Sequence, residues 1–273
     1  MLLFCHLPNR INTVPDWTYH LNNLANQLWR LSPACRIPAD PVQVKLVAHR
    51  GAYIAGNNSP APENTLAAFD RCLKHNIWGI ELDVRLTKDG EPVVHHDQAC
   101  GRLYQRPDIN IASTSFANLR RQLPQIPHLQ EVIERYGKHL HLMIELKASW
   151  RENKPLQPQL TRLLDTLEPG EHYHLLSLEP DHLEGFRQLP PATLVDVALT
   201  NTKDIIRQNI SLGHGAVAGS FALLNQAYIN QLKAAGKHIG TGQVNHPDIV
   251  NREAYRGIDW VFSDQPLRLI TNS

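Results

Sequence analysis

The chain has 273 residues, enough for one large domain or two small ones with a sizeable hydrophobic core. Apolar residues make up 42% and charged residues 19%, an ordinary balance for a globular protein. A formal net charge of +1 provides no field for binding nucleic acid, and no run approaches the roughly 18 apolar residues of a membrane span. The four cysteines are irregularly spaced, which favours free thiols. We therefore expect a cytoplasmic protein with no nucleic-acid partner and no transmembrane segment.

Residues 1–40 differ from the rest and are expected to form an N-terminal helical extension. Trp17, Leu21, Leu24, Leu28 and Leu31 are spaced as on one face of a helix over residues 16–31, and prolines follow. The favoured interpretation is a helix packed on the floor or flank of the following domain. The alternative is a membrane or partner helix, but its polar face is rich in Asn and Gln rather than Lys.

Apolar strand-like runs alternate with helical patterns over residues 41–273. Eight runs are expected to be strands: Val44–Ala48, Gly79–Val84, Leu140–Leu146, Tyr173–Ser177, Thr193–Leu199, Ala216–Ser220, His238–Gly242 and Trp260–Ser263. The helical patterns that follow them are Asn64–His75, Leu129–Tyr136, Gln157–Leu167, Pro180–Gln188, Lys203–Asn209, Gln226–Ala235, Pro247–Tyr255 and Pro266–Thr271. Eight strands, each followed by a helix, predict an α/β fold, a compact (β/α)8 TIM barrel.

One strand-like run, residues 92–96, comes too soon after the second strand for a parallel crossover. The turn dipeptide Asp89-Gly90 predicts that this run folds back as a short hairpin arm. With a two-residue turn, Asp83 would face His96 across the hairpin.

Three carboxylates stand at the ends of neighbouring predicted strands. Glu81 and Asp83 are two positions apart, so both side chains point to the same side of a strand, and Glu145 ends the next barrel strand. Carboxylates this close repel one another unless a cation lies between them. All-oxygen ligation favours Mg²⁺ or Ca²⁺, with Mn²⁺ also compatible, so we expect one divalent cation.

Imidazoles and cations accompany these carboxylates. His49 ends the first strand, and His49 and His96 are candidates for the acid and base of a hydrolysis, because imidazole titrates near neutral pH. Arg50 and Lys147 are candidate ligands for a phosphate group. Glu63 and Asn64 open the helix after the first strand, where capping and support of the site are equally compatible with their chemistry.

Read together, these motifs resemble the glycerophosphodiester phosphodiesterase family. The matching segments are His49-Arg50-Gly51, Pro62-Glu63-Asn64-Thr65, Glu81-Leu82-Asp83-Val84, Thr87-Lys88-Asp89-Gly90, His96-Asp97 and Glu145-Leu146-Lys147, with weaker matches at Ser177 and Ser263-Asp264. The resemblance implies a TIM barrel that hydrolyses a small-molecule glycerophosphodiester to glycerol phosphate and an alcohol with a divalent metal. It implies that His49 and His96 are the acid and base, that Glu81, Asp83 and Glu145 hold the metal, and that Arg50 and Lys147 hold the phosphate. In several relatives the neighbouring glycerol hydroxyl attacks first and gives a cyclic phosphate, which water then opens; the resemblance leaves open whether this intermediate forms here.

Departures from the family pattern concern the pocket, for which Ser177 and Asn245 are the candidate residues. The aromatic residue expected after Ser177 is Leu178, and Gln243 stands in a segment where the family often has aromatic and hydroxyl side chains. The segment Gln98–Ser115 is short, which favours a poorly covered leaving-group side.

Two other functions are compatible with the sequence. One is a lysophospholipase D-type activity, with an acyl chain resting on Phe221, Leu223 and Leu224. The other is a non-catalytic binding barrel, which the complete set of charged residues disfavours.

Overall fold

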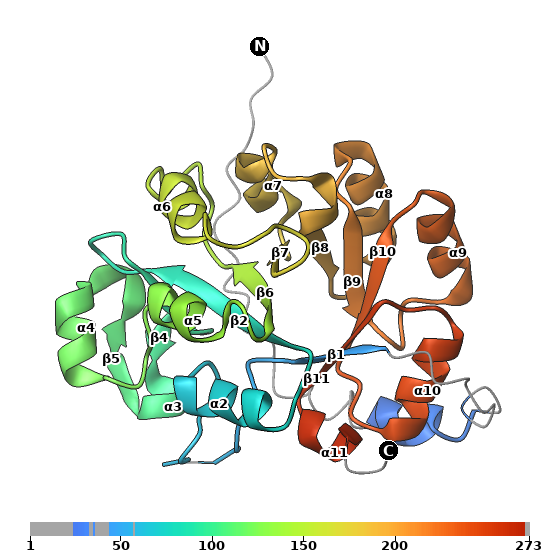
Figure 1. The fold of residues 1–273 in the computed structure, drawn as a ribbon, viewed down its shortest axis with the longest axis horizontal. Coiled ribbons are helices and arrows are strands. Elements are labelled where there is room, and N and C mark those ends of the chain that lie inside the picture. The colour runs from blue at the N-terminus through green and yellow to red at the C-terminus, as the bar shows by residue number, and fades with distance from the viewer. Residues whose placement is uncertain (1–23, 33–34, 36–43, 57, 271–273) are drawn as a thin grey trace.

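The computed structural model describes residues 24–32, 35, 44–56 and 58–270. Its centre is a closed barrel of eight parallel strands (Figure 1). Around the barrel these are β1 (Lys45–Ala48), β11 (Trp260–Ser263), β10 (His238–Gly242), β9 (Ala216–Ser220), β8 (Leu194–Ala198), β7 (Tyr173–Ser177), β6 (His141–Leu146) and β2 (Gly79–Leu86). Pairing of β1 with β2 closes the ring, with Val47 beside Gly79. The predicted TIM barrel and its eight strands are confirmed.

Helices between the strands cover the outside of the barrel (Figure 1). They are α2 (Leu66–Lys74), α5 (Leu129–Tyr136), α6 (Leu156–Leu163), α7 (Pro180–Leu183), α8 (Thr202–Leu212), α9 (Gln226–Ala234), α10 (Pro247–Tyr255) and α11 (Pro266–Ile270). The helix predicted over residues 180–188 is shorter than expected, because α7 gives way to the 3₁₀ turn η3 (Glu184–Phe186).

Side chains alternate between the barrel interior and the helix layer, as the twofold period of a strand requires. On β2, Ile80 and Leu82 belong to the core beneath the helices, so the intervening Glu81 and Asp83 point into the barrel. The interior below them is filled by a separate apolar group: Val47, Met143, Leu176, Val195, Ala216, Ala218, Trp260 and Phe262. The apolar filling seats the polar side chains at the carboxyl ends of the strands.

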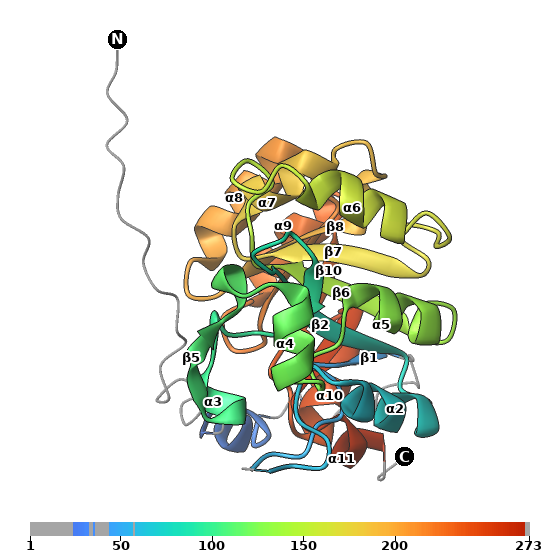
Figure 2. The same cartoon turned by 90° about the vertical axis from the view of Figure 1, so that its left-hand side faces the viewer.

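A short arm follows β2 and projects at one side of the barrel (Figure 2). It contains β3 (Pro92–Val94), β4 (Ala99–Cys100), α3 (Gly101–Tyr104), β5 (Arg106–Asn110), η2 (Ile111–Ser113) and α4 (Phe116–Gln122). The arm has a small core of its own, which includes Val93, Ile111, Leu119 and Ile126. The predicted hairpin between β2 and β3 is present.

The predicted hairpin register is wrong by one residue. Val84 pairs with Val94, so Asp83 lies level with His95, and the His95 N–H donates to the Asp83 carbonyl at 2.9 Å. The loop has three residues rather than two, and Gly90, the last of them, adopts φ +84°. Three-residue hairpin loops commonly end in such a left-handed residue. His95 itself is buried, and burial lowers its pKa to about 4, so this imidazole is neutral.

The described part of the N-terminal extension is helical over residues 24–29. It does not present the predicted face to the barrel, because Leu24, Leu28 and Leu31 are 53%, 54% and 62% exposed. Trp29 packs edge-on against Phe221, just after β9, with ring centroids 6.3 Å apart. The helix therefore lies at the carboxyl end of the strands rather than on the floor of the barrel. Residues 16–23 of the predicted helix lie outside the described residues.

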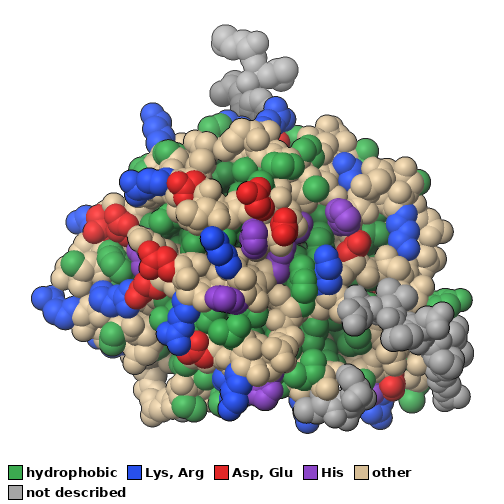
Figure 3. All heavy atoms as spheres, viewed as in Figure 1, with side chains coloured by type: hydrophobic (Ala, Val, Ile, Leu, Met, Phe, Trp, Pro, Cys, Tyr) green, Lys and Arg blue, Asp and Glu red, His purple; other side chains and the backbone are tan. Residues whose placement is uncertain are grey.

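The surface of the described chain mixes charges of both signs. Acidic and basic side chains are interspersed over the face drawn in Figure 3, and neither sign dominates it. Among the described helices, none combines the length and apolar character needed to cross a bilayer.

Gly51 shows how closely α2 approaches the loop after β1. Gly51 adopts φ +83°, and a Cβ there would lie 2.9 Å from Phe69 Cδ1. We expect Gly51→Ala to lower the free energy of unfolding by about 2–4 kcal/mol, from backbone strain and overpacking together. Chemical denaturation measures this.

Gly213→Ala is the matched control, because Gly213 has φ +80° but no atom within 4 Å of the added Cβ. It should cost only the backbone strain, about 1–2 kcal/mol. Equal losses in the two variants would contradict the proposed tight packing of α2 on the loop.

Candidate active site

Three carboxylates converge inside the mouth of the barrel, as predicted. Oxygen atoms of Glu81, Asp83 and Glu145 lie within 4.8 Å of one another, and β2 and β6 pair so that Asp83 is level with Glu145. Glu81 and Asp83 are only 2% and 1% exposed. Within the described part of the chain, Glu81 Oε1 is buried and accepts no hydrogen bond. A buried acceptor without a donor, beside two further carboxylates, fits a hard divalent cation that takes oxygen ligands.

The carboxylates differ in their electrostatic surroundings. Burial and the negative charges of Asp83 and Glu145 raise the pKa of Glu81. Asp83 is equally buried, but the charges of Lys147 and Arg50, with a smaller contribution from His96, hold the pKa of Asp83 well below its usual value. Without a metal, nearby positive charges therefore outweigh the cost of burying the Asp83 carboxylate, whereas the cost of burying the Glu81 carboxylate is not offset.

His49 stands at the end of β1 beside Glu81. Its Nδ1 donates to Asp264 Oδ1 at 2.6 Å, and its Nε2 lies 3.8 Å from Glu81 Oε2. Burial and the adjacent Arg50 disfavour the charged imidazole, but Asp264 and Glu81 outweigh them and raise the pKa of His49 to about 9. Asp264 holds Nδ1, so Nε2 is the nitrogen available to a substrate.

His96 has a matching arrangement at the base of the arm. Its Nδ1 lies 2.8 Å from Asp97 Oδ1, and its carbonyl accepts a hydrogen bond from Arg85 Nε at 2.7 Å. The pKa of Asp97 is lowered, because the hydrogen bond from His96 and the Arg102 guanidinium outweigh its burial. Asp97 thus orients the His96 imidazole through Nδ1, and no described residue forms a hydrogen bond with its Nε2.

Arg50 follows His49 in an unusual backbone conformation. Its φ is +58°, and this turn directs its N–H to Glu81 Oε2 at 3.0 Å. Its guanidinium reaches Glu63 Oε1 at 2.8 Å and lies 3.4 Å from Asp83 Oδ2. Arg50 therefore joins the loop after β1 to the carboxylate cluster.

Lys147 lies just beyond β6 on the same side as Glu145. Its Nζ is 2.8 Å from Asp83 Oδ1 and also contacts Glu145. These carboxylates overcome burial and raise the pKa of Lys147. Arg50 and Lys147 thus both lie at the carboxylate cluster.

Glu63 and Asn64 support the cluster rather than cap the helix, a role that Thr65 performs for α2. Asn64, at φ +59°, donates from Nδ2 to Asp83 Oδ2 at 2.7 Å and accepts from the Asp83 N–H at 3.2 Å. Glu63 Oε1 accepts from both Arg50 and Arg102, the latter at 2.6 Å, and Glu63 Oε2 accepts a second hydrogen bond from Arg102 at 2.9 Å. Their hydrogen bonds orient Asp83 and Arg50.

The two candidate pocket residues differ in their surroundings. Asn245 Oδ1 accepts from Ser263 Oγ at 2.9 Å and from the Asp264 N–H at 3.0 Å, so Asn245 is linked to His49 through Asp264. Ser177 is buried and instead contacts the Leu146 carbonyl and His182 Nδ1, at 3.3 and 3.1 Å. None of its hydrogen bonds in the described chain joins it to the carboxylate cluster.

Sequence reasoning assigned no role to Asp264 or Arg102. Asp264 could have been found, because a closed barrel places the last strand beside the first, and the His49 N–H donates to the Ser263 carbonyl at 2.9 Å. Nothing in the sequence around Arg102 indicates a role in the site, because its contacts with Glu63 and Asp97 depend on how the arm after β2 folds back.

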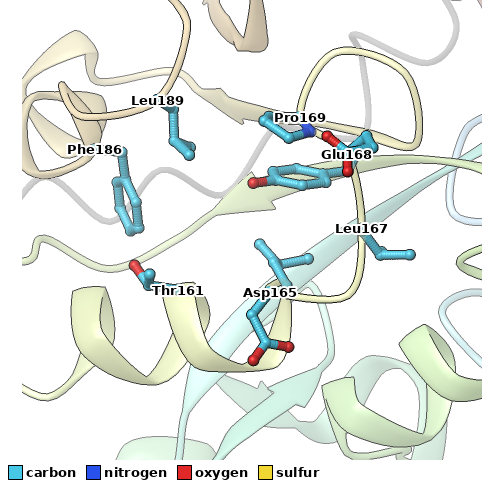
Figure 4. Close-up of a pocket in the computed structure, with 9 residues that line it drawn as sticks. Thr161, Asp165, Leu167, Glu168, Pro169, Phe186 and Leu189 are labelled. Atoms are coloured by element: carbon cyan, nitrogen blue, oxygen red, sulfur yellow. The ribbon is translucent and has the colours of Figure 1, made fainter.

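A separate hollow of about 280 Å³ lies on the outside of the barrel between α6 and β7. Figure 4 shows Phe186 and Leu189 on one side of it and Asp165 and Leu167 on the other. No histidine or arginine lines it, and it is not part of the carboxylate cluster. The candidate active site is therefore identified by its carboxylate, imidazole and cationic side chains, and this hollow lies elsewhere.

The carboxyl ends of barrel strands are where TIM-barrel enzymes carry their active sites, so the fold and the cluster together define a TIM-barrel enzyme. The sequence model of the glycerophosphoryl diester phosphodiesterase family matches residues 49–268. The chain belongs to this family.

Individual members of the family match this chain over most of their own lengths. The chain is 29% identical to a glycerophosphodiester phosphodiesterase of Bacillus altitudinis, across 83% of this chain and 96% of the relative. It is 27% identical to one from Bacillus subtilis, across 83% and 85%. Its fold is similar to that of an Oleispira antarctica phosphodiesterase solved with its product sn-glycerol-3-phosphate, with a TM-score of 0.71 and 24% identity over 83% of this chain and 95% of that one.

The opposite surroundings of Glu81 and Asp83 predict opposite effects on stability. In metal-free protein at pH 8, Glu81→Gln should raise the free energy of unfolding by about 1 kcal/mol or more, and Asp83→Asn should lower it. The raised pKa of Glu81 means that the folded state holds the carboxyl proton of Glu81 more tightly than the unfolded state does. The stability that this proton contributes is therefore lost as the pH rises from 4.5, the ordinary pKa of the group, to about 8. The gain from Glu81→Gln should accordingly be smaller at pH 5.

Denaturation in excess chelator at the two pH values measures both effects. Destabilisation by Glu81→Gln at pH 8 would show that Glu81 is compensated in the folded protein.

Proposed function

We propose that the protein hydrolyses glycerophosphodiesters to glycerol phosphate and an alcohol. One divalent cation, Mg²⁺ or Ca²⁺, is held by Glu81, Asp83 and Glu145, and His49 and His96 transfer protons. The observation that carries the proposal is the carboxylate cluster with a His–Asp pair beside each of its two β2 carboxylates: His49–Asp264 near Glu81, and His96–Asp97 near Asp83. Family membership and the product-bound barrel from Oleispira antarctica support the substrate class.

The two cationic side chains are suited to binding the phosphate. Arg50 presents a planar guanidinium and Lys147 a compact ammonium, and both lie within the barrel mouth beside the carboxylates. When bound, the cation would neutralise phosphate charge and acidify a coordinated hydroxyl. Because Glu63 and Asn64 hold Arg50 and Asp83 in place, little reorganisation is needed as substrate binds.

The histidines provide two sites for proton transfer. Each imidazole has its Nδ1 hydrogen-bonded to an aspartate, so each offers Nε2 to the substrate. A phosphodiester hydrolysis needs one group to accept a proton from the attacking hydroxyl and another to protonate the leaving alkoxide. Two separately oriented imidazoles can share these tasks. If a glycerol hydroxyl attacks first, the same pair serves the formation and the opening of the cyclic phosphate.

The surroundings of the site favour a deacylated substrate over a lysophospholipid. Phe221 and Leu224, which an acyl chain would need to contact, are fully buried in the core under the helices. Leu223 is the exposed member of that group, at 44%. A non-catalytic role fits poorly with two histidines that are each oriented through Nδ1 by an aspartate beside a complete carboxylate set.

Glycerol phosphate should be released from glycerophosphoethanolamine in the presence of Mg²⁺ or Ca²⁺, and excess chelator should abolish the release. Enzymatic detection of glycerol phosphate measures this. Persistence of full activity in chelator would contradict the assigned role of the three carboxylates.

His96→Gln separates proton transfer from metal binding. The variant keeps Glu81, Asp83 and Glu145, so calorimetric binding of the cation should remain while kcat falls by about 10²–10⁴-fold. Activity that survives in this variant would exclude His96 as a proton donor or acceptor.

Glycerophosphocholine should be a better substrate than lysophosphatidylcholine, because the exposed apolar surface after β9 is small. Choline release from the two compounds at equal concentration tests this. A higher kcat/KM for the acylated compound would favour the lysophospholipase D-type activity instead.

A further inference from the structure

Asn26, in the N-terminal helix, is bound at both ends of its amide to the loop after β10. Its Nδ2 donates to the Gln243 carbonyl at 2.9 Å, and its Oδ1 accepts from the Asn245 N–H at 2.9 Å. The side chain is 4% exposed, although several neighbours on the same helix are largely exposed. Both bonds join residues more than two hundred positions apart in the chain.

The loop that Asn26 holds has an unfavourable backbone conformation. Gln243 adopts φ +64°, a region that residues other than glycine seldom occupy unless their surroundings impose it. The next residue, Val244, is fully buried and donates its N–H to the Phe262 carbonyl at 3.0 Å. Asn26 thus holds Gln243 and Asn245, the residues on either side of Val244, and so sets the direction of the Asn245 side chain.

Asn245 continues the connection to His49. Its amide orientation is set by the Asp264 backbone N–H, which can only donate, so the atom that accepts at 3.0 Å is Oδ1. The same Oδ1 accepts from Ser263 Oγ at 2.9 Å. Asp264 in turn accepts from His49 Nδ1 at 2.6 Å. The hydrogen-bonded order is Asn26, Asn245, Asp264 and His49.

We infer that Asn26 is a positioning residue for His49, and that the N-terminal extension therefore contributes to the active site. The inference rests on the proposed catalytic role of His49. It concerns a part of this chain outside residues 49–268, the segment that matches the family. Asn26 reaches His49 through Asn245 and Asp264, so its loss should affect the reaction rate more than substrate binding.

A simple structural anchor would behave differently. The described helix also packs through Trp29 on Phe221, and an apolar contact of this kind anchors the helix without orienting Asn245. If Asn26 were only an anchor, its loss would lower stability and leave the geometry of His49 and Asp264 unchanged.

The test compares Asn26→Ala with Gln27→Ala, a matched amide deletion at an exposed neighbouring position. Asn26→Ala should lower kcat by about tenfold with KM changed less than about threefold, since misplacement of a proton-transfer group costs rate rather than binding. Gln27→Ala should retain the parent kcat. Combining Asn26→Ala with Asn245→Ala should give little further loss beyond Asn245→Ala alone, because both lie on one connection.

A second readout needs neither activity nor metal. An imidazole N–H in a short hydrogen bond to a carboxylate gives a proton resonance far downfield, and the His49 signal is assigned by its loss in His49→Gln. Asn26→Ala should shift or broaden this signal, and Gln27→Ala should leave it unchanged. If Asn26→Ala does not fold, Asn26→Asp keeps the acceptor for Asn245 but loses the donor to Gln243, and should show a smaller change of the same kind.

An unchanged His49 resonance, or fully additive effects of Asn26→Ala and Asn245→Ala on kcat, would overturn the inference. Absence of hydrolysis in the parent protein would instead contradict the proposed function, and the resonance would still decide whether Asn26 positions His49.

Discussion

The mutual repulsion of three carboxylates in the mouth of the barrel is the constraint around which the site is arranged. Glu81, Asp83 and Glu145 are brought together by strands whose apolar side chains form the core, so the carboxylates cannot move apart without loss of that core. Arg50 and Lys147 compensate Asp83, whereas Glu81 keeps an oxygen without a donor among the described residues. Part of the folding free energy thus offsets the electrostatic cost of holding three carboxylates together.

The groups that surround the cluster are each oriented by a further side chain. Asp264 and Asp97 fix the two imidazoles, Asn64 fixes Asp83, and Glu63 fixes Arg50. Hydrogen bonds of this kind set the tautomer and direction of a reactive group before substrate arrives. They also tie separate loops together, since most of the residues of the site follow strand ends.

Three of the six described non-glycine residues with positive φ lie in these same loops. Arg50, Asn64 and Gln243 all adopt positive φ, and each lies at the carboxyl end of a strand or at the start of the helix that follows. The first directs an N–H to Glu81, the second seats an amide on Asp83, and the third shapes the loop that carries Asn245. Residues in this conformation persist where surrounding contacts outweigh its cost, which is typical of functional sites.

The order of strands and helices could be read from the sequence because it is encoded locally. Apolar residues recur with the period of a strand or a helix, and the twofold period alone places Glu81 and Asp83 on one side of β2. Motifs at strand ends then identified the histidines, the carboxylates and both phosphate-binding candidates, because the carboxyl ends of barrel strands must meet.

Only the tertiary structure decided how distant segments meet. The one-residue difference in the hairpin register depended on the loop geometry at Gly90, and the exposed face of the N-terminal helix depended on what it packs against. The contacts of Asp264 with His49, Arg102 with Glu63 and Asn26 with Asn245 join residues far apart in the chain. Periodicity carries no information about such pairings, since each depends on the closure of the barrel and the path of its loops.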